Sequence, residues 1–175
     1  MKKPFIRSLI KPSINKIAKY IPGESTIAGS DKVIKLSSNE SPFTIPKKII
    51  SLIPKLALKT NFYPDGDSNL LKKNISKKFG LKKNQIVCGN GSDDILSVIC
   101  QTFSRENGEV ICSEYGFIYY PIIAKADGAN VVIAKSENLS TSCRNILKKI
   151  TSKTNLIFLA NPNNPTGTVI FKDEL

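Results

Sequence analysis

The sequence predicts an α/β domain with a largely parallel sheet that helices cover on both sides. From residue 85 onward, short apolar runs alternate with longer segments in which apolar residues recur at helical spacing. The short runs are continuously apolar, which is typical of strands buried on both faces. The alternation favours parallel pairing, because each helix returns the chain to the start of the next strand.

A chain of 175 residues, 41% of them hydrophobic, is long enough to bury the core of one ordinary domain. No apolar run approaches the ~20 residues that a membrane helix needs. Lysines and a proline between residues 11 and 16 interrupt the stretch that a secretory signal would require. We therefore expect a cytoplasmic protein with no membrane partner. The final Lys-Asp-Glu-Leu matches an endoplasmic-reticulum retention signal, and without a signal peptide we interpret the match as coincidence.

The composition is strongly basic, with 26 Lys+Arg against 14 Asp+Glu and a formal net charge of +12. Such an excess raises nucleic acid as a partner. However, the lysines form scattered pairs between apolar residues, and no arginine cluster or row of aromatic residues offers a platform for stacking bases. We interpret the charge as solvated helix faces that weakly favour an anionic substrate, and we expect no nucleic-acid partner.

Histidine is absent, and the four cysteines are widely spaced at positions 88, 100, 112 and 143. The absence of histidine excludes a Ser-His-Asp or Cys-His catalytic device, and the spacing provides no ligand cluster for zinc. Cys88, Cys100 and Cys112 each stand among apolar residues. We expect these three to be small core residues in a reducing compartment.

The beginning of the chain has weaker signals. A short amphipathic helix is expected over residues 9–20, a turn over 22–24 and a short strand over 33–36. Pro46 can open the next helix at its first position, and Pro54 must kink or restart it.

A turn and a longer helix follow. Pro-Asp-Gly at residues 64–66 has the chemistry of a tight turn. Ser68 is then placed to cap a helix whose apolar residues recur at helical spacing up to Phe79, and Gly80 is placed to end it.

The regular alternation comes after residue 85. The expected elements are strand 86–88, helix 92–103, strand 109–112, helix 117–127, strand 130–134, helix 142–151 and strand 155–160. Gly128 is expected to close the second of these helices. In the first, the residues expected to face the core are Ile95, Leu96, Ile99 and Phe103.

A glycine-rich turn separates the first of these strands from the first helix. Gly89 and Gly91 let the backbone adopt positive φ and approach a ligand, while the new helix leaves its first N–H groups unpaired. With the positive end of the helix dipole, these donors form a natural phosphate or carboxylate site. The alternative is a tight strand–helix connection in which Ser92 or Asp93 caps the helix. The turn alone leaves both open.

Known nucleotide-binding patterns do not fit this turn. A dinucleotide-binding GxGxxG would need a glycine where Asp94 stands, and a P-loop needs a lysine after its glycines. Protein-kinase motifs are also missing. A phosphorylated small molecule held by backbone amides stays open.

A second constrained loop follows the apolar run that ends at Leu159. Asn-Pro-Asn-Asn-Pro-Thr-Gly at residues 161–167 contains two prolines and a glycine, which fix a rigid turn. Its asparagines can direct amide donors into a cleft. Ligands of open α/β sheets bind beyond the carboxyl ends of the strands, and both this loop and the glycine turn are expected there. A rigid surface loop is the alternative.

This loop resembles the signature of the fold-type I, pyridoxal-phosphate-dependent aminotransferases. Other stretches agree with that family in order and spacing: Tyr20-Ile21-Pro22-Gly23, Leu36-Ser37-Ser38-Asn39-Glu40-Ser41-Pro42, Tyr63-Pro64-Asp65-Gly66, Gly89-Asn90-Gly91-Ser92-Asp93, and Tyr115. The resemblance covers nearly the whole chain, and its first two stretches favour the histidinol-phosphate aminotransferase subgroup. It implies an N-terminal arm and small-domain segment, residues 1–45, and a mostly parallel-sheet large domain, residues 46–175, that is incomplete at its C-terminus.

The resemblance also implies a role for each matching residue. Gly91, Ser92 and Asp93 match the turn that holds the phosphate of pyridoxal 5′-phosphate through backbone N–H groups. Tyr115 matches the aromatic residue that stacks on the pyridine ring, and Asn164 matches the amide that hydrogen-bonds the phenolic oxygen of that ring. The remaining matches are Tyr63, which would reach the cofactor phosphate of the partner subunit in a homodimer, and Tyr20 and Asn39 on the substrate side.

Plain structural roles compete with several of these assignments. The carboxylate of Asp93 is unsuited to face a phosphate, so we expect it to cap the helix or turn aside. Tyr115 belongs to an aromatic cluster, residues 115–120, and a core position is its alternative. Tyr20 at a helix end and Asn39 in a turn have equally simple explanations.

By the same resemblance, the activity is transamination of histidinol phosphate with 2-oxoglutarate in histidine biosynthesis, with a phosphorylated amino substrate and a 2-oxo acid as partners. That chemistry uses a lysine that binds the cofactor as a Schiff base, and an arginine on the phosphate. In the family both follow the Asn-Pro-Thr-Gly motif. No lysine of this chain stands in a matching context, so we assign no catalytic residue and expect the 175-residue chain to be an inactive fragment.

Two other functions compete. An aminotransferase of the same family that acts on aromatic or other amino acids would use the same half-domain. A non-catalytic module could bind a nucleotide through the glycine turn or nucleic acid through a basic face, although both nucleotide fingerprints fail.

Overall fold

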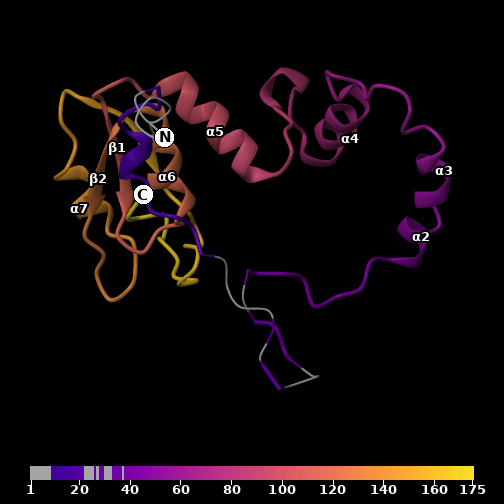
Figure 1. Cartoon of the computed structure of the whole chain (residues 1–175), viewed down its shortest axis with the longest axis horizontal. Helices are drawn as coiled ribbons and strands as arrows, with labels where there is room; N and C mark the ends of the chain where they lie inside the picture. The colour runs from indigo at the N-terminus through magenta and orange to yellow at the C-terminus, as the bar shows by residue number, and fades with distance from the viewer. Residues whose placement is uncertain (1–8, 22–25, 27, 30–32, 37) are drawn as a thin grey trace, which may run out of the picture. The chain divides into compact units, whose positions relative to one another are not determined.

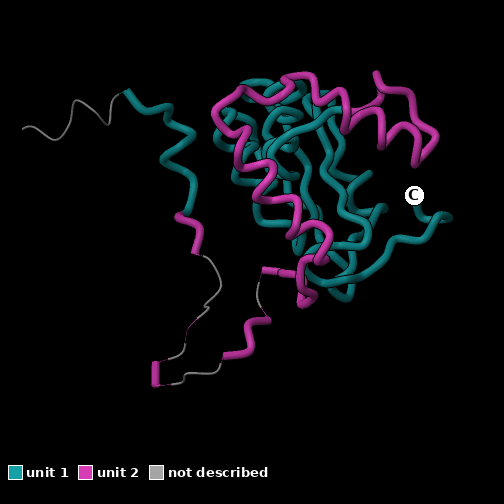
Figure 2. Tube along the Cα trace, turned by 90° about the vertical axis from the view of Figure 1, so that its right-hand side faces the viewer, with its two compact units in different colours: residues 1–18, 87–175 teal, residues 19–86 magenta. Residues whose placement is uncertain are grey.

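The computed structural model describes residues 9–21, 26, 28–29, 33–36 and 38–175. By its internal contacts the chain divides into two compact units, which Figure 2 distinguishes by colour: unit 1, residues 1–18 and 87–175, and unit 2, residues 19–86. The turn predicted over residues 22–24 lies outside the described residues. The domain boundary between residues 45 and 46 stays a prediction.

Unit 1 contains a parallel sheet, which confirms the predicted α/β fold. In the described residues its strands are β1 (Glu109–Ser113), β2 (Asn130–Ala134) and β3 (Thr154–Phe158), in the order β2-β1-β3. β1 lies in the middle, and its residues Val110 to Cys112 are almost completely buried. Burial from both faces explains why these three consecutive residues are all apolar.

Helices cover both faces of the sheet (Figure 1). On one face, α5 (Ser92–Phe103) and α6 (Tyr119–Asp127) form a core cluster with Val110, Cys112 and Phe158. On the other face, Ile146 of α7 (Cys143–Leu147) packs with Ile111 and Ala134. The longest described helix, α5, has 12 residues, and none of those described is long and apolar enough to span a bilayer.

β3 contains one residue more than β1 over their paired stretch. Thr154 is opposite Glu109, but the next residue of β1, Val110, is opposite Leu156. Asn155 is therefore an inserted residue, a β-bulge. The bulge sets which face of the sheet each later β3 side chain occupies.

Most predicted elements of unit 1 are present. α5 and β2 have the predicted bounds, and Gly128 ends α6 in the left-handed conformation with a φ of 95°. The helix predicted over 142–151 ends earlier, at Leu147, and the strand predicted to reach residue 160 ends at Phe158. Cys100 and Cys112 are buried in the core as predicted, while Cys88 is only partly buried.

Two predictions for this region are wrong. The structure has no strand over residues 86–88, because no described strand lies beside them to complete a ladder. Phe103, predicted to face the core, is 58% exposed. It lies in the last turn of α5, beyond Cys100, the residue of this helix that is buried.

The N-terminal helix predicted over residues 9–20 is also wrong. In the described part of this segment, the only helical element is one 3₁₀ turn, η1 (Ile14–Lys16). Pro12 removes a backbone donor, and an isolated helix this short is marginal without a surface to pack on. Residues 33–36, predicted as a strand, form no ladder in the described structure.

Unit 2 consists of short helices: α2 (Lys47–Ile50), α3 (Ile53–Ala57), α4 (Asn69–Phe79) and the 3₁₀ turn η2 (Lys83–Gln85). Pro46 immediately precedes α2 rather than occupying its first position, and Pro54 lies in the first turn of α3, so the helix restarts there as predicted. No described residue of unit 2 is buried.

The cap of α4 differs from the prediction. Ser68 makes no side-chain cap, because its backbone is left-handed with a φ of 51°. Asp65 from the Pro-Asp-Gly turn replaces it. One Asp65 oxygen accepts from the backbone N–H of Asn69 at 2.7 Å, and the other accepts from the N–H of Asp67 at 3.1 Å. Gly80 ends α4, as predicted.

Candidate functional site

The carboxyl ends of β1 and β3 lie side by side, because the two strands are neighbours in the sheet. The segment after β1 carries Tyr115, and the segment after β3 carries the loop 161–167. The Nδ2 of Asn163 donates to the carbonyl oxygen of Tyr115 at 3.0 Å. This hydrogen bond joins two of the segments that the sequence placed beyond the strand ends.

The middle of α5 contacts the segment that follows Tyr115. The hydroxyl oxygens of Ser97, in α5, and Tyr119 are 2.9 Å apart. Tyr119 opens α6 only four positions after Tyr115. The helix that the glycine turn opens is therefore joined to the segment that carries the exposed tyrosine.

The glycine turn starts α5 in the way that a phosphate site requires. Gly91 is the N-cap residue, and its φ of 84° favours glycine although a Cβ there would meet nothing within 4 Å. The N–H groups of Ser92 and Asp93 lie in the first turn, so they have no acceptor within the helix. Gly89 is crowded by side chains instead: a Cβ would lie 2.7 Å from Oδ2 of Asp94, so the Asp94 carboxylate would have to move.

Neither Ser92 nor Asp93 is the N-cap of α5, although the alternative interpretation of this turn expected one of them to be. The N-cap is Gly91, and Ser92 and Asp93 are the first two residues of the helix. Asp94 closes the turn, because its Oδ2 accepts from the backbone N–H of Asn90 at 2.9 Å. The carboxylate of Asp93 accepts from the Ser92 hydroxyl at 3.3 Å. The turn is thus stabilised without using the backbone donors of Ser92 and Asp93.

The loop 161–167 is held by its own asparagines. Asn161 pairs with Ile170 in both directions, donating from Nδ2 at 2.9 Å and accepting at Oδ1 at 3.0 Å. Asn163 donates from its side chain to Thr166 Oγ1 at 2.7 Å and from its backbone to the carbonyl of Thr168 at 2.8 Å. The loop has the constrained, internally bonded structure that its sequence predicted.

Asn163 is a residue of this region that the sequence analysis did not assign. It is 4% exposed, and its Oδ1 is buried without a hydrogen-bond partner in the described structure. An unpaired buried acceptor costs on the order of 1–3 kcal/mol. The sequence signal that could have indicated its role is the pair of adjacent asparagines. In the structure, Asn164 is partly exposed, whereas Asn163 is buried.

Tyr115 is available to a flat ligand. This residue is 44% exposed, whereas Tyr120 of the same aromatic cluster is 8% exposed and stacks on Phe158 with centroids 4.7 Å apart. Tyr120 is therefore the core tyrosine of the cluster. The N–H of Gly116 donates to the carbonyl of Ser113 at 3.0 Å, which closes a tight turn around Tyr115.

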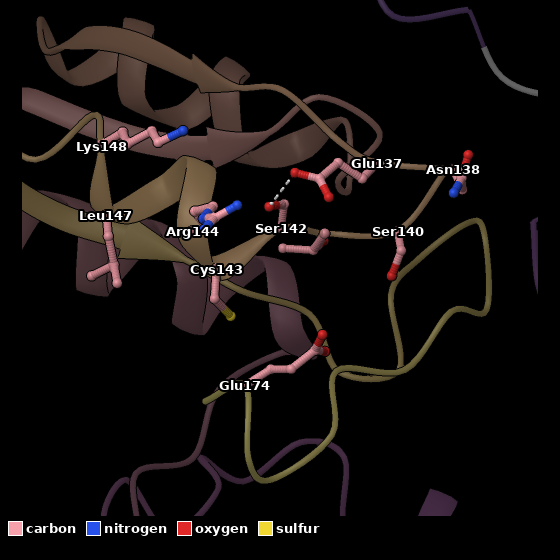
Figure 3. A pocket seen from close by; sticks show the side chains of 10 residues that line it. Glu137, Asn138, Ser140, Ser142, Cys143, Arg144, Leu147, Lys148 and Glu174 are labelled. Carbon is pink, nitrogen blue, oxygen red and sulfur yellow. Dashed lines mark hydrogen bonds between the residues drawn. The ribbon is translucent and has the colours of Figure 1, made fainter.

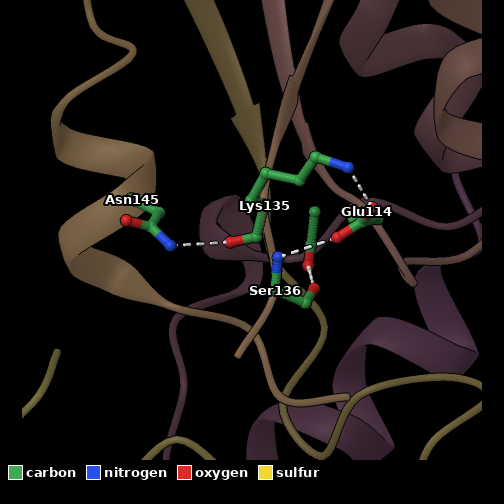
Figure 4. A network of polar contacts seen from close by, with 5 residues as sticks. Glu114, Lys135, Ser136 and Asn145 are labelled. Carbon is green, nitrogen blue, oxygen red and sulfur yellow. Dashed lines mark hydrogen bonds and ion pairs between the residues drawn. The ribbon is translucent and has the colours of Figure 1, made fainter. Parts of the chain in front are cut away.

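A polar network beside Tyr115 fixes the ends of β1 and β2 (Figure 4). Lys135 and Glu114 form an ion pair at 2.5 Å, and Glu114 also accepts from the N–H of Ser136 at 3.1 Å. The bonds from Lys135 and Ser136 hold the pKa of Glu114 below its ordinary value, and the bond to Glu114 raises the pKa of Lys135. Lys135 is therefore neutralised by a protein partner. The Nδ2 of Asn145 donates a further hydrogen bond to the backbone carbonyl of Lys135 at 3.0 Å.

A cavity of about 850 Å³ lies elsewhere in unit 1, beside α7 (Figure 3). Its lining comes from residues 137–148 and Glu174 and contains none of the predicted site residues. Arg144 and Lys148 face two carboxylates across it, and Glu137 accepts from Ser142 at 3.0 Å. With balanced charges and none of the predicted residues, this cavity is not the candidate site.

Three predicted site residues belong to unit 2. Tyr63 is fully exposed and Tyr20 is 54% exposed, while Asn39 lies in a turn with a φ of 50°. The functional roles that the sequence suggested for these three residues stay predictions.

The chain belongs to the family described as aminotransferase class I and II, whose sequence model matches residues 31–175. Among curated relatives, the chain is 44% identical over 160 residues to the histidinol-phosphate aminotransferase of Pelagibacter ubique, covering 91% of this chain and 44% of that protein. It is also 44% identical over 170 residues to the enzyme of that name from Rhodopseudomonas palustris strain BisA53, covering 97% of this chain and 47% of that protein. The chain therefore spans less than half the length of these relatives.

Solved structures agree with this assignment. The histidinol-phosphate aminotransferase of Clostridium acetobutylicum matches with a TM-score of 0.67 and 30% identity, over 79% of this chain and 40% of that chain. The enzyme of the same name from Sinorhizobium meliloti, in complex with pyridoxal-5′-phosphate, has a TM-score of 0.70 over 73% of this chain and 35% of that chain. At 24% identity, the second likeness shows the fold alone.

Proposed function

We propose that this chain forms part of a pyridoxal-phosphate-dependent aminotransferase that transfers an amino group between histidinol phosphate and 2-oxoglutarate in histidine biosynthesis. The observation that carries the proposal is the meeting of Tyr115 and the loop 161–167 beyond the carboxyl ends of two neighbouring strands. The names of the relatives supply the substrate.

The start of α5 fits the phosphate end of this cofactor. The backbone N–H groups of Ser92 and Asp93 and the helix dipole favour a dianion. The space beside Gly91, where a Cβ would meet nothing within 4 Å, lets a phosphate approach the backbone. The nearby carboxylates are already hydrogen-bonded to Asn90 and Ser92, which directs their charge into the turn.

The other end of the site fits an aromatic ring with a polar edge. The exposed ring of Tyr115 offers a flat surface for stacking. Asn164 follows the buried Asn163 and carries an amide suited to the phenolic oxygen. Pyridoxal phosphate, when bound, supplies the electron sink that transamination needs. The residues of this chain bind and orient that group.

The lysine that the chemistry requires is not assigned to any residue of this chain. We therefore expect the 175-residue chain to bind the cofactor's phosphate and ring without turning over substrate. A homodimer in which Tyr63 reaches the cofactor of the partner subunit, and a cytoplasmic location, belong to the same proposal.

Binding of pyridoxine 5′-phosphate tests the phosphate site. This probe has no aldehyde, so it cannot react with the many surface lysines. We expect the chain to bind it measurably by isothermal titration calorimetry and to bind pyridoxine, which lacks the phosphate, much more weakly. Gly91→Val should weaken binding at least about tenfold, because valine is strained at a φ of 84° and the turn must rearrange.

Gly80→Val is the matched control, since it places the same residue at a φ of 69° in unit 2. It should leave binding unchanged. Equal binding by wild type and Gly91→Val would contradict the phosphate site. Formation of glutamate from 2-oxoglutarate and histidinol phosphate by the chain alone would contradict its assignment as an inactive part.

A further inference from the structure

We propose that Asn163 is a positioning residue whose buried carboxamide sets the spacing between Tyr115 and Asn164. The inference rests on the proposed function, in which the tyrosine covers the face of the cofactor ring and the asparagine binds its edge. Asn163 itself is 4% exposed and lies behind both.

The direction of the carboxamide is fixed by chemistry. A backbone carbonyl only accepts hydrogen bonds, so the atom that faces the oxygen of Tyr115 at 3.0 Å must be the nitrogen. The second hydrogen of this nitrogen is used on Thr166 Oγ1 at 2.7 Å. Both donors of one amide group are therefore committed, one to each strand-end segment.

The tyrosine side of this link is rigid. The N–H of Gly116 donates to the carbonyl of Ser113 at 3.0 Å, and a Cβ on Gly116 would lie 3.1 Å from that carbonyl oxygen. The Ser113 hydroxyl is buried and lies 3.1 Å from the hydroxyls of Ser136 and Thr141. The backbone of Tyr115 is therefore held by the turn on one side and by Asn163 on the other.

The loop side is equally constrained. The backbone N–H of Asn163 donates to Thr168 and its carbonyl accepts from Gly167, each at 2.8 Å. Asn164 is covalently next in the chain. Any movement of the Asn163 carboxamide therefore moves the two cofactor-facing residues relative to each other.

The unpaired Oδ1 distinguishes this role from simple loop closure. Asn161 closes the same loop with both of its polar atoms bonded to Ile170. Asn163 bonds across to a different strand end and leaves its own acceptor unused in the described structure. The amide nitrogen of Asn163, and not its oxygen, therefore makes the side-chain hydrogen bonds at this position.

The first test measures order at Tyr115 without any cofactor. The chain contains five tyrosines, so 3-fluorotyrosine labelling gives a simple ¹⁹F spectrum, and Tyr115→Phe identifies the signal of interest. We expect this signal to shift and broaden in Asn163→Ala and Asn163→Asp. It should stay in place in Asn130→Ala, a control at the opposite end of the sheet that also removes one bond from an amide nitrogen to a backbone carbonyl, that of Asn107.

Asn163→Asp separates positioning from space filling. Aspartate has the same shape as asparagine but presents an oxygen, instead of a donor, to the carbonyl of Tyr115. A residue that only filled space would tolerate this change. A wild-type Tyr115 signal in a folded Asn163→Asp variant would overturn the inference.

The second test measures binding of pyridoxine 5′-phosphate. Loss of the Asn163 link should weaken binding about tenfold, as expected for one lost hydrogen bond that orients the site. Asn130→Ala should change binding less than about twofold even if it lowers the melting temperature. Unchanged affinity in folded Asn163 variants would also overturn the inference.

The two tests keep the inference separate from the proposed function. If the wild-type chain binds no probe, the proposed function fails, yet the ¹⁹F spectra still decide whether Asn163 positions Tyr115. If Asn163→Ala and Asn163→Asp do not fold, Thr166→Val removes only one partner of the carboxamide. It should broaden the Tyr115 signal to a smaller extent, and a wild-type signal would overturn the inference.

Discussion

The two units of this chain build helices of similar length with different results. In unit 1, α5 has 12 residues and places Cys100, with 1% exposure, in a core formed with the sheet. In unit 2, α4 has 11 residues and no buried residue. Both have apolar residues at helical spacing. An apolar stripe thus predicts a helix, but a core requires a second element that the stripe can cover.

The difference lies in what surrounds each helix. β1 is paired on both sides and covered on both faces, so several elements share one apolar volume. The described helices of unit 2 hold no strand between them. Large side chains such as Leu70 and Phe62 are consequently more than 70% exposed. We expect unit 1 to account for most of the stability of the chain.

A pair of core-truncating substitutions should show the largest contrast. Ile111→Ala removes a fully buried side chain of β1 and should lower the free energy of unfolding by about 2–5 kcal/mol. Leu70→Ala, at a side chain that is 72% exposed in α4, should change it by less than about 0.5 kcal/mol. Urea denaturation followed by circular dichroism measures both. Losses of equal size would remove the distinction between the units.

Two glycines extend the contrast to turns. Gly89→Ala should cost about 1 kcal/mol and weaken binding of pyridoxine 5′-phosphate, because the new Cβ displaces the Asp94 carboxylate, 2.7 Å away, from the N–H of Asn90. Gly66→Ala in unit 2 meets nothing within 4 Å and should be neutral or slightly stabilising. Thermal melts and calorimetry of the two variants check this. A neutral Gly89→Ala would show that the turn can open.

The core of unit 1 should also produce a pH dependence. Burial raises the pKa of the Cys112 thiol from 9.0 to about 12. In the unfolded chain the thiol ionises near its ordinary pKa, so its contribution to stability is complete below that pKa and falls as the pH rises toward about 12.

Denaturation at neutral pH and at about pH 10 should therefore show a loss of stability that is smaller in Cys112→Ala. The comparison with this variant removes the contributions of tyrosines and lysines, which titrate in the same range. An identical loss in both proteins would contradict a buried, protonated thiol.

The smallest effect is expected at the cap of α4. The backbone N–H of Asn69 is the main cause that lowers the pKa of Asp65. Because the folded pKa is depressed, the cap stabilises α4 above the ordinary carboxyl pKa and is lost as the pH falls through the folded pKa. Asp65→Asn should slightly accelerate amide hydrogen exchange in α4 and leave β1 unchanged. Asp67→Asn controls for the loss of one negative charge in the same turn.

Periodicity and turn chemistry predicted correctly those elements whose structure is determined by their own local sequence. The strand predicted over residues 130–134, with its apolar run 131–134, and the stripe over 92–103 match β2 and α5 without change. The asparagine loop and the exposed tyrosine follow adjacent strands, as the rule for parallel sheets requires. These features depend on local sequence and on a general property of the fold.

The failures depend on neighbours that the sequence does not display. Residues 86–88 have strand propensity, but no described strand lies beside them. Ser68 has the right chemistry for a cap, yet Asp65, from the preceding turn, accepts from the first N–H of the helix, that of Asn69. Asn163 could not be separated from Asn164 until the carbonyl of Tyr115 gave one of them a partner. A spatial partner decides each of these cases.

The bulge at Asn155 divides β3 into a part that tolerates a change in length and a part that does not. Deleting Asn155 removes the inserted residue, and Leu156 can stay opposite Val110. Deleting Ile157, beyond the bulge, has no such remedy. Either Phe158 turns away from the ring of Tyr120, or the chain beyond it moves back by about 3.3 Å, the rise of one strand residue. The second outcome withdraws Asn163 from Tyr115, so the register of β3 after the bulge and the geometry of the site cannot vary independently.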